Sequence, residues 1–501
     1  MGSPELRRLT TDPALDASPC WSPNGQEIAF VRGETERTVH VVSPLGGADR
    51  KVSDFSVAGA IAWSPDGHWI AAGHNVKLPP SAADARGIYL IPIEGGEPRP
   101  IVRSEPPAID LSPAFAPDGR RLAYASCGYP HCAVYVVELD AAFRPVGAPR
   151  QLGTPINFTT TSIAWARDGR SVIYSTYEAS LVNYLWRVPT DGSRTAERIE
   201  AAGLGAVGPA TVLSRDQLAF ARTSQDVDLY RFIAGHPPEA VAASSLPEME
   251  AALSADGQRL AFTSARSADA LQIWVSAADG SGPRQLTRGA RPQGSPSWSP
   301  DGRRIAFDSF DDDSRYHIWI MDADGGNRRQ VTTDRGNQNL PTWSGDGQWI
   351  YFSWDPGDGR DIWRTTLEGR RTERVTRGGS GLLGREAADG KTLLYQQKDG
   401  DQPLLAAPLS GGPPRQVIAC VSPTAFAVAA TGIYYLPCTR DVNAPMHLVD
   451  PETGSDRLLG TLEKYFYETL PAILTVSRDG RTLLYGRATG TTDLMLMENF
   501  R

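Results

Sequence analysis

The sequence predicts an all-β protein, a β-propeller built from eleven four-stranded blades. Three observations lead to this prediction: a repeat of about 45 residues, an Asp-Gly turn in most repeats, and four short extended segments per repeat. One repeat reads SPSWSPDGRRIAFDS over residues 295–309, and close relatives of it occur at residues 19–30, 61–72 and 341–352. Because one ring usually holds four to eight blades, we expect two propellers, with a single large ring as the alternative.

The turn is the clearest marker of each repeat. Its second residue is Asp in most repeats, and Gly supplies the positive φ of a tight hairpin turn. Aspartates mark eight well-formed turns: Asp66, Asp118, Asp168, Asp256, Asp301, Asp346, Asp389 and Asp479. Three further turns, at Asn24, Asp216 and Thr431, depart from the pattern, and Asp216 is the one not followed by Gly. These residues are predicted to shape hairpins.

Extended segments flank each turn. In the seventh repeat they read SPSWS, RRIAFDS, YHIWIMD and RRQVTT, which are rich in β-branched and aromatic residues. The twelve tryptophans fall in or beside such segments; five of them, Trp21, Trp63, Trp165, Trp298 and Trp343, directly precede the turn. We interpret them as aromatic packing between blades.

The degenerate fifth repeat, residues 205–250, marks a seam. We therefore expect one domain over residues 1–204, with blades one to four, and a second over residues 205–501, with blades five to eleven. The last repeat lacks an outer strand, whereas the segment ELRRLTT near the N-terminus resembles one. We expect residues 5–10 to pair with the third strand of the last repeat, which would leave no open edge.

The motif W-S-P-D-G-x-x-I-A-F, matched along essentially the whole chain, resembles the WD40-like PD40 repeats of TolB-type propellers. The C-terminal stretch LLYGRATGTTDLMLMENFR further resembles the ends of bacterial winged-helix regulators and Ser/Thr kinases that carry such a propeller outside the cytoplasm. These resemblances imply a periplasmic sensor or protein-binding scaffold attached to a regulator.

Five cysteines divide into two candidate pairs and one residue left over. Cys127 and Cys132 bracket a four-residue hairpin loop, and Cys420 and Cys438 lie on neighbouring strands, so both pairs are candidate disulfides. Cys20, beside Trp21, is expected to be a buried free thiol. Two disulfides would favour an oxidising compartment, and a cytoplasmic location stays open.

Composition excludes several classes of partner. The net charge is -8 and no run of basic residues could follow a phosphate backbone, so nucleic acid is not expected. The longest uncharged run, residues 416–439, contains two prolines and a glycine, which argues against a membrane-spanning helix.

No catalytic, cofactor or metal signature accompanies the repeats. A G-x-S-x-G nucleophile elbow is missing, and the phosphate-loop-like GREAADGKT at residues 384–392 contains a predicted hairpin turn. The seven histidines lack metal-site spacing, and the acidic run at residues 311–313 does not fit a calcium loop. We expect a non-enzymatic scaffold without a cofactor, binding a protein or small ligand at its loops or channel. The alternative is a propeller enzyme, similar to a lactonase or cyclotransferase, with a metal in the channel.

Overall fold

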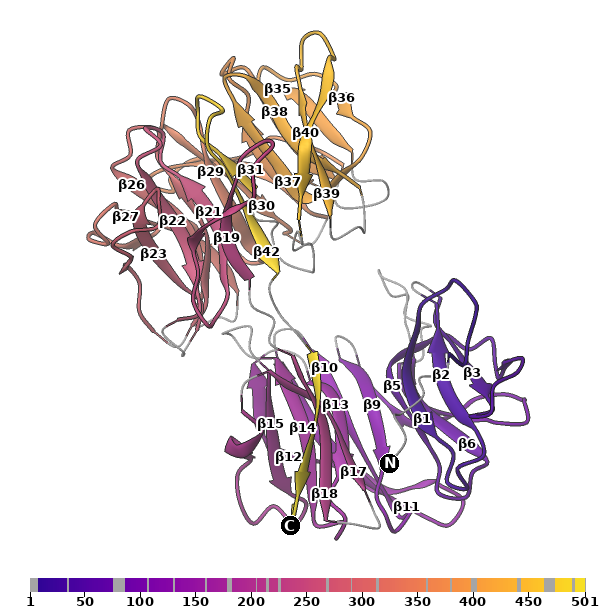
Figure 1. The fold of residues 1–501 in the computed structure, drawn as a ribbon. Helices are drawn as coiled ribbons and strands as arrows, with labels where there is room; N and C mark the ends of the chain where they lie inside the picture. Colours follow the sequence, from indigo (N-terminus) through magenta and orange to yellow (C-terminus); the bar gives the residue numbers. More distant parts are fainter. Residues whose placement is uncertain are drawn as a thin grey trace. The chain divides into compact units, whose positions relative to one another are not determined.

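The computed structural model contains eleven antiparallel sheets in two compact units (Figure 1). It describes residues 8–33, 36–74, 86–105, 108–128, 131–157, 160–177, 183–203, 205–212, 216–223, 227–266, 270–289, 291–311, 315–356, 359–378, 381–397, 403–438, 443–463, 474–488 and 492–500. Unit 1 comprises Met1–Glu178, Val182–Ser224 and Thr492–Arg501, and unit 2 comprises Ala179–Leu181 and Gln225–Thr491. The division favours two propellers over a single ring.

Unit 1 holds five sheets, of which the last has three strands among the described residues. In sheet order they are β1 (Asp16–Trp21), β2 (Ile28–Arg32), β3 (Thr38–Val42), β4 (Arg50–Lys51); β5 (Val57–Trp63), β6 (Trp69–His74), β7 (Gly87–Pro92), β8 (Arg99–Arg103); β9 (Ile109–Phe115), β10 (Arg121–Gly128), β11 (His131–Leu139), β12 (Pro145–Asn157); β13 (Thr160–Trp165), β14 (Ser171–Tyr177), β15 (Asn183–Pro189), β16 (Glu197–Arg198); and β17 (Ala206–Val212), β18 (Gln217–Thr223), β43 (Thr492–Glu498). A 3-10 turn, Glu200–Ala202, follows β16.

Unit 2 holds six four-stranded sheets. They are β41 (Leu474–Val476), β42 (Leu483–Ala488), β19 (Val227–Phe232), β20 (Glu239–Ala242); β21 (Glu248–Leu253), β22 (Arg259–Ser264), β23 (Gln272–Ala277), β24 (Arg284–Gln285); β25 (Gln293–Trp298), β26 (Arg304–Phe310), β27 (Tyr316–Asp322), β28 (Arg329–Gln330); β29 (Gln338–Trp343), β30 (Trp349–Trp354), β31 (Asp361–Thr366), β32 (Thr372–Arg374); β33 (Gly381–Glu386), β34 (Thr392–Gln397), β35 (Leu404–Pro408), β36 (Arg415–Ile418); and β37 (Val421–Ala429), β38 (Gly432–Pro437), β39 (Ala444–Val449), β40 (Asp456–Leu462).

The repeated Ser-x-Asp-Gly turn stabilises the hairpin between the first two strands of a blade. Ser299 Oγ donates to Asp301 Oδ1 at 2.6 Å and accepts from the Arg304 backbone N–H at 2.9 Å. Asp301 Oδ1 also accepts from the Arg303 N–H at 3.0 Å, and Gly302 has φ 67°. The motif therefore satisfies polar groups of the turn locally, which explains why it recurs.

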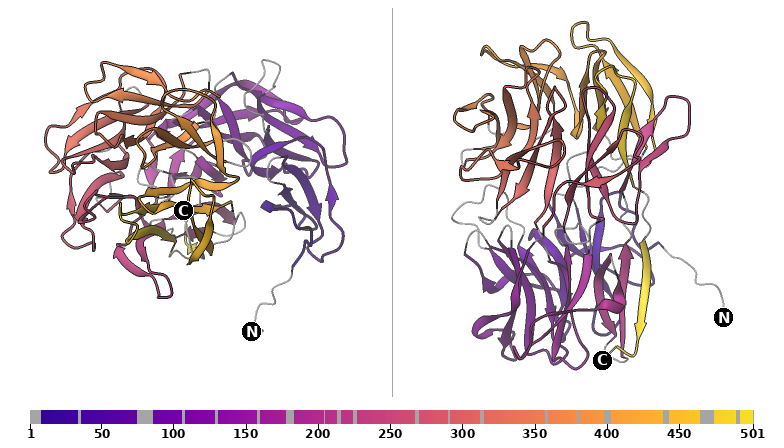
Figure 2. Two further views of the ribbon diagram at one scale, coloured as in Figure 1. Left: turned by 90° about the horizontal axis from the view of Figure 1, so that it is seen from above. Right: turned by 90° about the vertical axis from the view of Figure 1, so that its left-hand side faces the viewer.

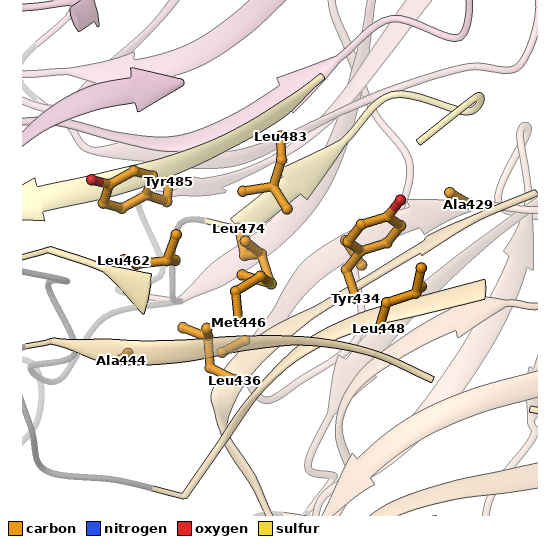
Figure 3. Close-up of a cluster of buried hydrophobic side chains, with 12 residues drawn as sticks. Ala429, Tyr434, Leu436, Ala444, Met446, Leu448, Leu462, Leu474, Leu483 and Tyr485 are labelled. Carbon is orange, nitrogen blue, oxygen red and sulfur yellow. The ribbon is translucent and has the colours of Figure 1, made fainter. Parts of the chain in front are cut away.

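The six blades of unit 2 form a closed ring. Each first strand contacts the next in the order β21, β25, β29, β33, β37 and β41, and β41 contacts β21 again. Figure 3 shows part of the closing contact, in which Leu436 and Met446 of one blade lie beside Leu474 and Leu483 of the next. All four side chains are buried, so an apolar core joins the C-terminal strands to the ring.

The C-terminal strands complete one blade in each unit. Strand β42 pairs with β19 and completes the ring of unit 2, whereas β43 pairs with β18 in unit 1. Figures 1 and 2 show both C-terminal strands in yellow beside magenta strands from the middle of the chain. The sequence predicted the fifth and eleventh repeats as contiguous blades, but each is divided between the two units. The division covers the edges of β18 and β19, which would otherwise remain unpaired. The chain passes between units near residue 225, whereas the sequence placed the domain division after residue 204.

The predicted pairing of residues 5–10 with the last strand is not seen in the described part of that segment. Residues 5–7 lie outside the described residues, and residues 8–10 belong to no strand. The segment instead contacts the first blade: Thr10 bonds the side chain of Asp16, and Asp12 lies 3.6 Å from Arg32. The prediction is therefore wrong for residues 8–10, which form no strand and lie beside the first blade.

Candidate functional site

The central channel of unit 2 is built from the first strands of its six blades. A narrow part of about 70 Å³ is lined by residues of all six, including Glu250, Ser295, Leu340 and Thr424. It opens into a wider cavity of about 980 Å³, bordered by the turn residues of the hairpins. We call these parts the throat and the mouth.

A bulge in the first strand shapes the throat. Glu250, Ser295, Leu340 and Thr424 have φ values of 53°, 51°, 58° and 56°, which non-glycine residues adopt infrequently. The strand register shifts at or near each of these residues, as expected for a β-bulge.

Buried polar side chains bond these bulges across blade boundaries. The Leu340 backbone N–H donates to Asp308 Oδ2 at 3.0 Å, and the Thr424 N–H donates to Gln396 Oε1 at 2.6 Å. The Ser295 N–H donates to Glu250 Oε2 at 2.7 Å. Each bond joins consecutive blades and satisfies a buried N–H group, so the wall of the channel is preorganised.

Two carboxyl groups meet at the wall of the throat, which Glu250 lines. A β-carbon at Gly294 would lie 2.7 Å from Glu250 Oε2 and 3.1 Å from Asp308 Oδ1, so both groups flank this glycine. Burial raises the pKa of Glu250, and burial together with the Glu250 charge raises the pKa of Asp308 to about 7. Two like charges so close are unfavourable, and the pair holds a proton near neutral pH.

Arg385 on β33 lines both the throat and the mouth. Its Nε is buried without a hydrogen-bond partner, and burial lowers its pKa to about 10. The adjacent Glu386 accepts bonds from the Tyr351 hydroxyl at 2.9 Å and the Gly345 N–H at 3.0 Å. The channel therefore exposes a cation, and the carboxylate of the next residue in sequence is bonded elsewhere.

Aromatic and basic side chains border the mouth. The Trp349 ring lies under two guanidinium groups, 4.3 Å from that of Arg364 and 5.3 Å from that of Arg371. Arg478 is exposed on a hairpin turn. Such amphipathic groups are typical of protein-binding surfaces.

The residues that the sequence singled out lie mainly in the scaffold. All eight turn aspartates occupy hairpin turns, and two of them, Asp346 and Asp389, also border the mouth. The Sγ atoms of Cys127 and Cys132 are 2.07 Å apart, and those of Cys420 and Cys438 are also at bonding distance. Cys20 is unpaired, and burial raises its pKa to about 12.

The tryptophans before the turns bond neighbouring blades, with one exception. The indole N–H of Trp298 donates to the Ala252 carbonyl at 3.1 Å, and that of Trp343 donates to the Ser297 carbonyl at 3.0 Å. Trp63 and Trp165 make equivalent bonds. Trp21, predicted to pack between blades, is instead 58% exposed, and its indole donates no hydrogen bond to another described residue.

Sequence reasoning missed Glu250, Asp308 and Arg385. For Asp308 the sequence held a usable signal, a polar residue at one register position of the second strand. Thr263, Asp308, Ser353 and Gln396 occupy this position in four blades. Of the acidic run at residues 311–313, Asp311 accepts a bond from the Trp319 indole at 3.0 Å, and the other two lie outside the described residues.

The described residues contain neither a cluster of metal ligands nor a membrane-spanning helix. They contain no group of three or more His, Cys, Asp or Glu side chains placed to hold a metal ion. Within the same ranges, no helix has the length and apolar character needed to cross a bilayer.

Comparisons with known proteins agree with this architecture. The family model of the TolB beta propeller domain, PD40, matches residues 5–180 and 229–419. A TolB homologue of Chlorobium luteolum is 30% identical over 134 residues, which cover 27% of this chain and 29% of that protein. An uncharacterized protein of Agrobacterium fabrum is 31% identical over 230 residues, covering 45% of this chain and 71% of its own. The chain thus spans less than a third of the TolB homologue.

Among solved structures, TolB of Acinetobacter baumannii is similar over 74% of this chain and 81% of its own, with 14% identity and a TM-score of 0.39. A putative TolB of Agrobacterium tumefaciens is similar over 78% of this chain and 94% of its own, with 18% identity and a TM-score of 0.30.

Proposed function

Because the chain belongs to the TolB β-propeller family, we propose that it is a non-enzymatic scaffold whose partner, a protein, binds at the mouth of the unit 2 channel. The observation that carries this proposal is the mouth itself, a cavity of about 980 Å³. Hairpin turns from neighbouring blades form its border. A preorganised surface loses little conformational entropy on binding. Trp349 and the arginines around it supply an aromatic and basic contact area.

Partner capture with two matched variants tests this proposal. Arg478→Glu reverses a charge on a turn at the mouth, and Arg303→Glu reverses one on a turn that does not border it. Neither side chain has a bonded partner among the described residues, so both variants should fold normally. We expect proteins from the native organism to be retained by wild type and Arg303→Glu and lost by Arg478→Glu. Equal retention by both variants would contradict binding at the mouth.

The enzyme alternative predicts turnover instead of binding alone. Purified protein would be assayed for lactone hydrolysis and for a stoichiometric divalent metal. Turnover abolished by Glu250→Gln or Asp308→Asn in folded protein would replace the scaffold with a channel enzyme.

We further propose an extracytoplasmic location and a role as the sensor part of a bacterial regulator. Two cysteine pairs at bonding distance support an oxidising compartment. The resemblance of the C-terminus to regulator-linked propellers supports the sensor role. Trapping thiols in intact cells of the native organism, followed by fractionation, tests the location: reduced pairs in a cytoplasmic fraction would exclude it.

A further inference from the structure

Arg385 is a charged group in the channel, and no described residue forms an ion pair with it. No described residue forms a hydrogen bond or an ion pair with its guanidinium, whose Cζ lies 5.8 Å from the centroid of the Phe426 ring. Its Nε is buried, whereas the side chain as a whole is partly exposed to the channel. A buried donor without a partner is unfavourable unless an anion or ordered water completes its bonds. The arrangement is therefore incomplete in the chain alone.

Carboxylates elsewhere in the channel wall are bonded to other groups. Glu386 is held by Tyr351 and Gly345, and Glu250 accepts from the Ser295 N–H and from the Thr263 hydroxyl, both at 2.7 Å. Turning Glu250 toward Arg385 would leave the partly buried Thr263 and Ser295 donors unsatisfied, and turning Glu386 would leave the Tyr351 hydroxyl unsatisfied. The chain is thus built to keep this cation available.

Hydroxyl groups lie at the same depth of the channel. Ser297, Thr342 and Thr475 line both throat and mouth, as Arg385 does. The Thr342 hydroxyl donates to the Gly384 carbonyl at 2.6 Å, whereas the Ser297 hydroxyl has no bonded partner among the described residues. A ligand at this depth meets one free cation and at least one free hydroxyl.

We propose that Arg385 is the centre of a carboxylate-binding subsite, into which the partner inserts an Asp or Glu side chain or its C-terminal carboxylate. That the carboxylate belongs to a protein rests on the proposed function; the subsite itself does not. A planar carboxylate matches the two parallel N–H donors of a guanidinium. The throat of about 70 Å³ admits a small group, and the acidic pair at its wall disfavours a dianion such as phosphate.

Three small probes test the subsite on the full chain by calorimetry or saturation-transfer NMR at matched ionic strength. N-acetylglycine represents a C-terminal carboxylate, N-acetylaspartate amide represents a side chain, and inorganic phosphate represents a dianion. The amides N-acetylglycinamide and N-acetylasparagine amide are the matched neutral probes. We expect at least one carboxylate to bind about tenfold or more tightly than its amide, and more tightly than phosphate.

Variants at Arg385 identify the site. Arg385→Met should abolish the preference for acid over amide, and Arg385→Lys should reduce it about tenfold, because it keeps the charge and loses the paired donors. Arg303→Met is the control and should bind as wild type. Since the Arg385 side chain bonds no described residue, Arg385→Met should fold; if it does not, the Arg385→Lys variant alone is compared with wild type.

The possible outcomes separate the two proposals. An acid-to-amide preference that is missing in wild type, or unchanged in Arg385→Met, would overturn the subsite, as would tighter binding of phosphate. If carboxylates bind at Arg385 while partner capture ignores Arg478→Glu, the subsite stands and the proposed function fails. If capture depends on Arg478 and no carboxylate binds, the proposed function stands and the subsite fails.

Discussion

Replacing Asp308 by Asn should remove a pH-dependent loss of stability in unit 2. Asp308 is 4% exposed, and its pKa rises from an ordinary 3.8 to about 7 in the fold. A carboxyl group whose folded-state pKa is raised contributes stability below its unfolded pKa and loses it as the pH rises through the folded pKa. The wild-type unit should therefore become less stable between about pH 4 and pH 8.

The size of the effect follows from the two pKa values. The full rise corresponds to roughly 4 kcal/mol, at about 1.4 kcal/mol for each pKa unit. Of this roughly 4 kcal/mol of stability, the linkage relation predicts that roughly 2–3 kcal/mol is lost between about pH 5 and pH 8. Asn cannot ionise, keeps an acceptor oxygen for the Leu340 N–H, and offers an amide donor to Glu250. The variant should escape the loss.

Urea unfolding at about pH 5, 6, 7 and 8 measures the difference. The unfolding free energy of Asp308→Asn minus that of wild type should rise by roughly 2–3 kcal/mol across this range. Asp301→Asn in the same blade is the matched control, because bonds from Ser299 and Arg303 lower the pKa of Asp301 and place its titration below this range. A difference that stays flat within about 0.5 kcal/mol, the scatter expected of an ordinary surface substitution, would refute the shared-proton account of this pair.

Three other predictions concern the scaffold. Trp298→Ala should lower the unfolding free energy by about 3–5 kcal/mol, since Trp298 is 7% exposed, bonds Ala252 and stacks 4.4 Å from the Arg259 guanidinium. Trp21→Ala, at an exposed position, should cost about 0.5 kcal/mol or less, and equal costs in calorimetry would contradict the packing difference. Thiol counting on denatured, oxidised protein should find one free thiol, from Cys20, whereas five would exclude both disulfides. Deleting residues 492–501 should destabilise unit 1, where β43 covers β18, and leave unit 2 intact; hydrogen exchange unchanged at residues 217–223 would show that β43 is dispensable.

Local chemistry determined the blades. The turn of each repeat satisfies its own polar groups through Ser299, Asp301 and their equivalents, and the strands on either side are mostly buried. A pattern that acts over a few residues can be read directly from the sequence. The number of repeats, their all-β character and the two cysteine pairs follow from such local signals.

Only tertiary structure decided how the blades close and where the channel is polar. Strands β42 and β43 are neighbours in sequence, yet β42 pairs with β19 of unit 2 and β43 with β18 of unit 1, because each unit had an open edge to satisfy. Likewise Glu250, Asp308 and Arg385 belong to three different repeats and resemble ordinary strand residues in each. Closing six blades into a ring brings their first strands around one axis and places the Arg385 guanidinium in the channel, where no described residue bonds it.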